Sequence, residues 1–343
     1  MISKKYKFGV LGCGFWAKYQ ILGWKELDGV ELVALYSRTR SKAEKFAREF
    51  NVPKIYDAPE QIMADSEIDF VDIITDVAVH SELVKLAAKY QKPVICQKPM
   101  ARSLEEGKAM VEVCKKAGIP FMVHENWRWQ TPIRKLKEII DSGIIGKPFR
   151  CNLYFNNSFP IYDNQPFLAE IDQFIIADLG IHILDTARFL LGDAQSLYCQ
   201  TSRANPDIKG EDVASIIMQI GDVTCLVQIS FFSILKDERF PQTYALVEGD
   251  KGSVRLGFDY RISITTREGT HSFHATPVKY SWVHPDYAVV QSSIVSANAN
   301  WLDSLKTGKE PETCGEDNLK TLELVYSAYE SAKTGRAFKL RIP

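Results

Sequence analysis

Two carboxylates and an imidazole recur at helical spacing in an otherwise apolar stretch. The segment 177–192 reads ADLGIHILDTARFLLG and places Asp178, His182 and Asp185 at positions i, i+4 and i+7. On a helix these three share one face. Because buried carboxylates and imidazoles cost free energy unless they are paired or wet, the stripe indicates either a catalytic site or an internal salt-bridge network. In the second interpretation Asp185 pairs with Arg188 or a neighbouring element, and His182 is a satisfied core histidine.

Bulk composition limits the classes of partner. A chain of 343 residues predicts about two domains, and its 42 basic and 43 acidic residues nearly cancel. We therefore expect a small-molecule ligand, with neither nucleic acid nor membrane as partner. Seven cysteines without C-x-x-C spacing favour neither a disulfide framework nor a zinc site, so no structural metal is predicted. The start of the chain lacks an apolar core of signal-peptide length, which predicts a cytoplasmic protein.

A glycine motif follows the first predicted strand, 7–11, and opens a predicted helix that continues to residue 27. This is the dinucleotide-binding fingerprint G-x-G-x-x-A in its usual context, although a simple glycine-rich turn is the alternative. The first glycine permits the tight turn, the second lets the backbone approach a pyrophosphate, and the alanine allows close packing of helix on strand. Free N–H groups at the helix start would hold the phosphates. The residues involved are Gly12, Gly14, Phe15, Trp16 and Ala17.

The second predicted strand, 30–36, ends without the acidic residue that NAD enzymes usually place on the ribose hydroxyls. Ser37 and Arg38 stand there instead. A hydroxyl and a guanidinium can accept a 2′-phosphate, so the pair favours NADP without excluding NAD, and Arg38 could also stack on adenine. Lys42 is a further candidate for cofactor binding, with a solvated surface charge as its alternative interpretation.

Strand and helix patterns alternate from 70 to 124, which predicts a parallel sheet. Ligands of such sheets lie beyond the carboxyl ends of the strands. The cofactor candidates at that edge are Thr75, Val77, His80, Gln97 and Lys98. Lys98 follows a fully apolar strand, and its ammonium could polarise a substrate hydroxyl or stabilise a developing alkoxide.

The pattern changes after Arg128, where a helix and then a series of short strands joined by turns such as Gly221-Asp222 predict an antiparallel meander. The expected fold class is α/β followed by α+β. We expect residues 1–125 to form a doubly wound Rossmann sheet that binds NAD(P), and residues 126–343 to form a substrate-binding α+β domain with a large open antiparallel sheet. Asn126, Trp127 and Arg128, just beyond the last strand of the first domain, are candidates for binding a carbohydrate, with packing between domains as the alternative.

Six motifs, taken together, resemble those of a known family. They are Gly12-Cys13-Gly14-Phe15-Trp16-Ala17, the segment 75–80, Gln97-Lys98-Pro99, Asn126-Trp127-Arg128, Ile145-Gly146 and Asp178-x-x-x-His182-x-x-Asp185. Over nearly the whole chain the sequence resembles the glucose–fructose oxidoreductase, inositol dehydrogenase and rhizopine-catabolism (Gfo/Idh/MocA) family of NAD(P)-dependent oxidoreductases. It departs from the family pattern at Asp76, where proline is usual, and at Gln97, where glutamate is usual.

The resemblance implies a dehydrogenase that moves a hydride between nicotinamide and a hydroxyl of a sugar or polyol, an aldose such as apiose or a cyclitol. It implies Lys98, Asp178 and His182 as the catalytic set, with Asp185 as a further substrate candidate. Histidine as a residue type titrates near neutral pH and suits the proton step, Asp178 could orient it, and Lys98 could hold the reacting oxygen. A competing assignment makes Lys98 the acid/base. A ligand sensor that turns nothing over and an NAD-dependent glycosidase are alternative functions.

The resemblance also implies that the open sheet pairs subunits into a homodimer or homotetramer, and an exposed sheet face makes this plausible.

Overall fold

A computed structural model describes residues 4–237 and 239–341 of the chain. The chain forms two compact units. The first contains the residues up to Asn126 together with Ile294–Leu319, and the second contains Trp127–Ser293 together with the residues from Lys320 onward. The division of the chain at residue 125 remains a prediction. It does not include Ile294–Leu319 in the first unit.

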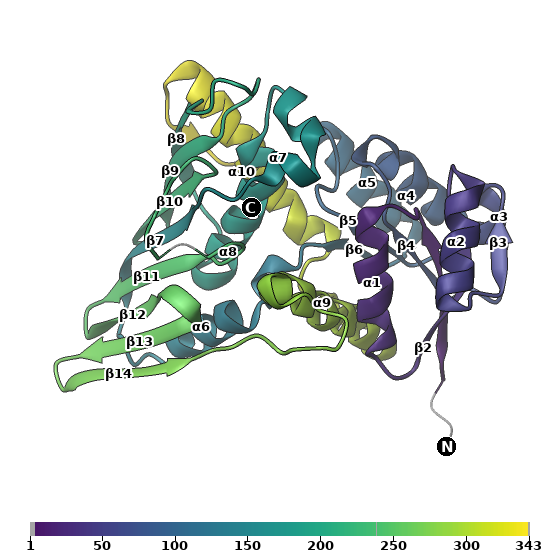
Figure 1. Cartoon of the computed structure of the whole chain (residues 1–343), viewed down its shortest axis with the longest axis horizontal. Helices are drawn as coiled ribbons and strands as arrows, with labels where there is room; N and C mark the ends of the chain where they lie inside the picture. The colour runs from purple at the N-terminus through teal and green to yellow at the C-terminus, as the bar shows by residue number, and fades with distance from the viewer. Residues whose placement is uncertain (1–3, 238, 342–343) are drawn as a thin grey trace. The chain divides into compact units, whose positions relative to one another are not determined.

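The first unit is built on a six-stranded parallel sheet with the strand order β3-β2-β1-β4-β5-β6. Its strands are β1 Tyr6–Leu11, β2 Val30–Tyr36, β3 Lys54–Tyr56, β4 Phe70–Ile73, β5 Val94–Gln97 and β6 Phe121–His124. The helices that flank this sheet in Figure 1 are α1 Phe15–Lys25, α2 Arg40–Phe50, α3 Pro59–Ala64, α4 His80–Lys89 and α5 Leu104–Ala117. Strands β4 to β6 are buried along their whole length, as expected of a sheet covered on both faces. The prediction of a doubly wound parallel sheet is confirmed.

The late segment completes the core of this first unit. It contains most of α9 (Ala288–Thr307) and the start of α10 (Gly315–Thr334). Trp301 packs edge-on against Phe70 of β4, with 5.9 Å between ring centroids. Asn298 lies within hydrogen-bond distance of His124 in β6, at 3.1 Å, and the amide of Gln20 in α1 donates to it at 3.2 Å. These buried contacts tie the end of the chain to strands formed near its start.

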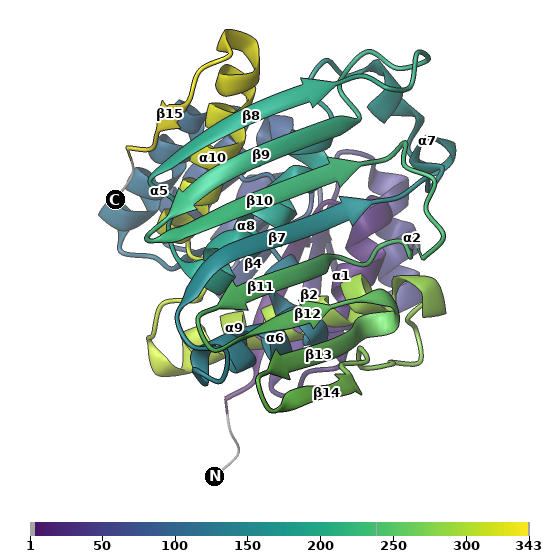
Figure 2. The same cartoon turned by 90° about the vertical axis from the view of Figure 1, so that its left-hand side faces the viewer.

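The second unit is built on a nine-stranded sheet with the order β14-β13-β12-β11-β7-β10-β9-β8-β15. Figure 2 shows these strands side by side. They are β7 Pro148–Asn156, β8 Ser196–Ser202, β9 Val213–Ile220, β10 Val223–Ser230, β11 Tyr244–Gly249, β12 Gly252–Leu256, β13 Arg261–Thr266, β14 Gly269–His274 and β15 Phe338–Lys339. The sheet is large and mostly antiparallel, as predicted. It is not a simple meander, because β7 lies between β11 and β10 and pairs with β10 in parallel.

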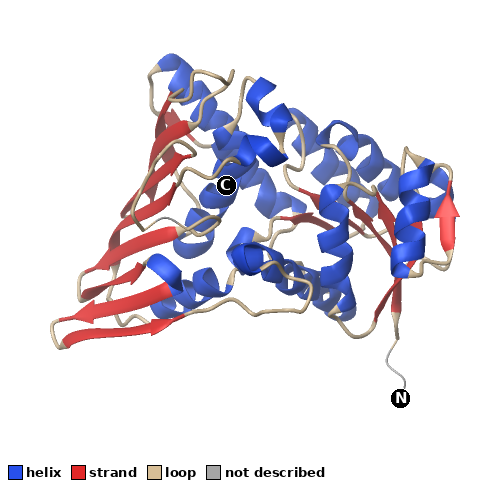
Figure 3. Ribbon diagram, viewed as in Figure 1, coloured by secondary structure: helices blue, strands red, loops and turns tan. Residues whose placement is uncertain are grey.

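Helices of this unit lie against one face of the sheet. They are α6 Thr131–Asp141, α8 Ile181–Leu191 and the end of α10, while the short α7 spans Ile161–Asn164. Figure 2 shows α6 and α8 behind the strands, and Figure 3 shows the helices of this unit, in blue, on one side of its red strands. In β9 buried and exposed residues alternate strictly, so one face of the sheet is core and the other is open. No helix in the described part of the chain is long and apolar enough to span a bilayer.

Candidate active site

The turn after β1 has the geometry that the fingerprint predicts. Gly12 adopts a φ of +108°, a conformation that L side chains rarely adopt, and its N–H donates to the Tyr36 carbonyl at 2.8 Å. A Cβ at this position would lie 2.3 Å from the Ile74 carbonyl oxygen, so only glycine fits between the two neighbouring strands. The turn therefore brings the start of α1 to the carboxyl edge of the sheet.

The start of α1 is open. Gly14 precedes the helix without a side-chain cap, and a Cβ there would meet no atom within 4 Å. Phe15 is 76% exposed, whereas Ala17 is fully buried against the sheet. Because the first N–H groups of a helix attract anions, this arrangement fits the pyrophosphate of a dinucleotide.

Basic side chains surround the end of β2. Arg38 and Lys42 are exposed, and neither forms an ion pair with any residue that the structure describes. Arg40 is different, because it pairs with Glu44 and with Asp57. Ser37 is half-buried at the strand end. The two unpaired cations are thus available for a phosphate or an adenine ring.

Asp76, which stands where proline is usual in the family, has a structural role in the loop after β4. Its carboxylate accepts a hydrogen bond from the Ala78 N–H at 2.9 Å and so caps the short 3₁₀ turn Val77–Val79. The Oγ1 atom of Thr75 is buried and has no hydrogen-bond partner among the described residues. An unsatisfied buried hydroxyl at the carboxyl edge of the sheet is what a missing ligand would leave.

His80 joins two loops of this edge. Its Nδ1 lies 3.1 Å from the Pro99 carbonyl oxygen and its Nε2 lies 3.2 Å from the Thr75 carbonyl oxygen. The ring is buried, and burial lowers its pKa despite these bonds. With both nitrogens at backbone carbonyls, His80 shapes the edge instead of reaching outward.

Gln97 and Lys98 follow one another at the end of β5. Gln97 is 7% exposed, and its buried Nε2 has no hydrogen-bond partner in the described residues. The glutamate that is usual in the family at this position would lack this N–H donor. Lys98 is half-buried and stands one residue beyond the strand. The open helix start, the Thr75 hydroxyl and the Gln97 amide all lie at the carboxyl edge, and together they fit a dinucleotide there.

In the second unit, the helix that carries the predicted stripe does not begin as a regular α-helix. Residues Ile176–Gly180 form a π-helical turn that runs directly into α8. Asp178 lies in the π turn and is half-buried, His182 lies in the first turn of α8 and is 5% exposed, and Asp185 is fully buried. π turns are rare in proteins, and those that occur often lie at functional sites.

An aromatic ring fixes the imidazole. Trp127 stacks on His182 with 4.4 Å between ring centroids and 18° between planes. The indole is held in turn, because its Nε1 donates to Thr243 Oγ1 at 2.9 Å. Trp127 is 5% exposed, so one of its faces supports His182 and cannot also cover a sugar. No local pattern singles out Thr243, which is 116 residues from Trp127 along the chain.

Arg128 and Asp185 bind each other. The guanidinium Nε and Nη2 donate to the two carboxylate oxygens at 2.7 and 2.6 Å, and Thr321 donates a third hydrogen bond at 2.9 Å. Both charged groups are almost completely buried. The geometry corresponds to the alternative interpretation of Asp185 as a member of an internal salt-bridge network, although its main partner is Arg128 and Arg188 is at 3.9 Å.

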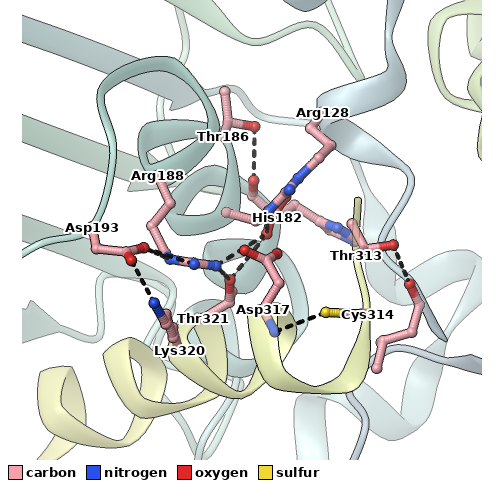
Figure 4. Close-up of polar contacts among 12 residues, drawn as sticks. Arg128, His182, Thr186, Arg188, Asp193, Thr313, Cys314, Asp317, Lys320 and Thr321 are labelled. Atoms are coloured by element: carbon pink, nitrogen blue, oxygen red, sulfur yellow. Dashed lines mark hydrogen bonds and ion pairs between the residues drawn. The ribbon is translucent and has the colours of Figure 1, made fainter. Parts of the chain in front are cut away.

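Arg188 continues this network toward the surface, as Figure 4 shows. It donates to Thr321 at 2.8 Å and to Asp193 at 2.7 Å, and Lys320 also donates to Asp193. Burial works against ionisation of Asp193, but its bonds to Lys320 and Arg188 prevail and lower the pKa of this carboxyl. These ion pairs and hydrogen bonds join α8 to Lys320 and Thr321 in the first half of α10, and so support the turn that carries His182.

Asn126, the remaining substrate candidate, ends the first unit and is 3% exposed. Elsewhere in that unit Glu310, Cys314 and Glu316 have potential ligand atoms within 4.8 Å of one another. Lys115 already pairs with Glu316, and burial raises the pKa of the Cys314 thiol, so this group is poorly suited to a cation.

A parallel sheet of this order with an open glycine turn defines a Rossmann nucleotide-binding fold. The chain belongs to the Gfo/Idh/MocA family: residues 6–125 match the family model described as "Oxidoreductase family, NAD-binding Rossmann fold", and residues 133–255 match the "GFO/IDH/MocA C-terminal domain". The predicted family is confirmed, and the protein is an NAD(P)-dependent oxidoreductase.

Similar proteins extend over the whole chain. A D-apiose dehydrogenase of Rhizobium rhizogenes is 43% identical, with 98% of each chain covered. A D-apiose dehydrogenase of Paraburkholderia graminis is 41% identical over 98% of this chain and 90% of its own. The crystal structure of an oxidoreductase from Agrobacterium radiobacter, in complex with NAD+, L-tartaric acid and magnesium, superposes with a TM-score of 0.96 at 42% identity and covers 98% of both chains.

Proposed function

We propose that the protein is a sugar dehydrogenase, with D-apiose or a similar aldose as substrate. The observation that carries this proposal is the 43% identity to a D-apiose dehydrogenase across 98% of both chains. A second relative of the same name supports it. An identity of this size over full length supports a common substrate class more strongly than it supports one particular sugar.

The chain's own residues divide the work of binding the cofactor. The N–H groups of Phe15 and Trp16 would hold the pyrophosphate, and the Thr75 hydroxyl and Gln97 amide would bind the nicotinamide ribose end. When bound, the nicotinamide accepts or returns a hydride, which no side chain can do. The open surroundings of Gly14 leave room for the pyrophosphate to approach the backbone.

The proton step falls to Lys98 and His182. In the favoured assignment His182 removes the hydroxyl proton, Asp178 orients the imidazole, and the Lys98 ammonium holds the reacting oxygen. In the competing assignment Lys98 itself transfers the proton. The stacking of Trp127 on His182 supports the first, because a general base must be held in one orientation.

The direct test mixes the purified protein with NAD⁺ or NADP⁺ and a panel of aldoses and cyclitols while absorbance of the reduced nicotinamide is followed. We expect turnover with D-apiose above that with cyclitols. Tight cofactor binding without turnover of any panel member would indicate a ligand sensor. Release of sugar from an aryl glycoside without net change in the cofactor would indicate a glycosidase.

We further propose that the cations at the end of β2 favour NADP over NAD. Exposed Arg38 and Lys42 without ion-pair partners support this choice, and the family as a whole accommodates both cofactors. Arg38→Ala should then raise the KM for NADP⁺ several-fold and leave that for NAD⁺ unchanged. An enzyme that prefers NAD⁺ before and after the substitution would reject this proposal.

For assembly, we propose a homodimer or homotetramer formed through the open face of the nine-stranded sheet. A row of residues in register crosses the centre of this face: Tyr198, Ile217, Leu226, Asn152 and Leu246. Ile217 is 47% exposed, although most isoleucines are buried. Ile217→Glu should produce monomers in light scattering, whereas Thr265→Glu near the edge of the sheet should not.

A cytoplasmic location is also a proposal. All seven cysteines are free thiols in the described residues, and six are buried, which suits a reducing compartment. Fractionation of cells that express the protein would test it, since recovery outside the cytoplasm would reject the assignment.

A further inference from the structure

The start of the helix with Asp178 and His182 is held by two side chains that the proposed reaction does not use. The backbone N–H groups of residues 174–177 need outside partners because the helix begins there. The Glu211 carboxylate accepts from the first and third of them, at 3.2 and 3.3 Å, and its main-chain carbonyl accepts from the second, at 3.2 Å. The Tyr329 hydroxyl accepts from the fourth at 3.0 Å and donates to Glu211 Oε1 at 2.8 Å.

These two residues converge from distant parts of the second unit. Glu211 stands two residues before β9, and Tyr329 lies in the last third of α10. Gly210 makes the close approach possible, because a Cβ there would lie 2.7 Å from the Ile171 carbonyl oxygen. Burial and the adjacent Glu211 carboxylate raise the pKa of Tyr329 far above its ordinary value, so its hydroxyl stays a donor.

We propose that Glu211 and Tyr329 are positioning residues that fix the π turn and thereby the orientation of Asp178 and His182. This rests on the proposed function of those two residues. A π turn holds one residue more than an α turn, and loss of that residue would rotate the preceding side chains by about 100° around the helix axis. Because the hydrogen bonds from Glu211 and Tyr329 end at the turn itself, they favour the π form over its relaxation to a regular helix.

The first test compares variants of the full-length enzyme with bound cofactor. Tyr329→Phe should lower kcat at least tenfold and leave the Kd for reduced cofactor unchanged. Glu211→Gln, which keeps an acceptor, should retain more activity than Glu211→Ala. Tyr56→Phe is a matched control, because it removes a 2.6 Å hydrogen bond from a tyrosine to Asp65 in the other unit. Wild-type kcat in Tyr329→Phe, or equal losses in Glu211→Gln and Glu211→Ala, would overturn the proposal.

A double-mutant cycle separates positioning from a merely structural role. If Tyr329 acts through His182, Tyr329→Phe should reduce the residual rate of His182→Ala by less than twofold, although it costs the wild type tenfold or more. Additive losses would overturn the positioning role and leave the proposed function intact. A His182→Ala enzyme with wild-type kcat would overturn the proposed catalytic role of His182, and the positioning role with it, whereas absence of turnover in the wild type would overturn the proposed function.

Discussion

The N-termini of two helices in this chain differ in whether side chains cap their first N–H groups. α1 begins without a side chain on its first N–H groups, and Gly14 before it has open space. In the helix with Asp178, by contrast, the first N–H groups donate to Glu211 and Tyr329. An uncapped helix start can bind an anion, whereas a capped one holds its own residues in place. The contrast distinguishes a start suited to ligand binding from one suited to positioning side chains.

The largest effect should come from the proposed catalytic side chains, of which the capped helix positions His182. His182→Ala and Lys98→Ala should each lower turnover by about 10²–10⁴ and spare cofactor affinity, because proton transfer and oxygen stabilisation are lost while the α1 start is unchanged. Steady-state rates and a fluorescence titration of reduced cofactor measure the two quantities. His271→Ala, on the edge strand β14, is the control. Near-normal rates in both variants would reject the catalytic assignment.

The next largest effect concerns the ion pair behind the capped helix. Asp185→Ala leaves the Arg128 guanidinium buried without its carboxylate and should cost about 3–5 kcal/mol of unfolding free energy. Urea titration measures the change. The paired replacement Arg128→Met with Asp185→Leu should recover most of the loss. A single variant as stable as the wild type would mean that the network contributes nothing to holding α8.

A smaller, pH-dependent effect on stability is expected at the contact between α1 and β4. Trp24 Nε1 donates to Asp72 at 2.8 Å, and burial, only partly offset by this bond, raises the pKa of Asp72 to about 7. A raised pKa means that the stabilisation by the protonated carboxyl is complete below about pH 4 and is lost as the pH rises through 7. Asp72→Asn has no charge to bury, so it should gain up to about 2 kcal/mol on the wild type between pH 5 and 8. A pH-independent difference in urea midpoint would contradict this.

The smallest effect tests the uncapped start directly. Gly14→Ala meets no atom in the protein and has a φ of −86°, so thermal stability should be unchanged or slightly higher. A methyl group beside the pyrophosphate should nevertheless weaken cofactor binding about tenfold, or 1.4 kcal/mol. Calorimetric titration measures it. Gly12→Ala, which collides with the Ile74 carbonyl, should lower both properties. Unchanged affinity in Gly14→Ala would place the phosphates elsewhere.

Local patterns predicted the long elements well. The bounds expected for β2, 30–36, agree with the structure to the residue, because an apolar run marks this strand. α2 was missed because only Ala43 and Phe46 of its eleven residues are buried, which leaves little periodic signal. β3 and α3 have three and six residues, too few to show a period.

The site was predicted only where its residues lie next to strands or on one helix. Sequence spacing placed Asp178, His182 and Asp185 on one regular helix, but a π turn cannot be read from a 3.6-residue period. The partners that decide their roles come from far along the chain. Glu211 and Tyr329 lie 37 and 152 residues from the backbone groups that they bind. Such pairings depend on tertiary packing, which no local pattern encodes.

The contribution of residues 294–319 to the first unit affects how the protein is made. A ribosome releases the chain from the N-terminus, so β1 to β6 emerge long before Asn298 and Trp301 can pack against them. Until then the nascent nucleotide-binding unit exposes the apolar surface of Phe70 and is a natural client for chaperones. The same interleaving means that a gene fragment ending at residue 126 would not be a transferable cofactor-binding module. Recombination that exchanges this unit between relatives must exchange two separate pieces of coding sequence.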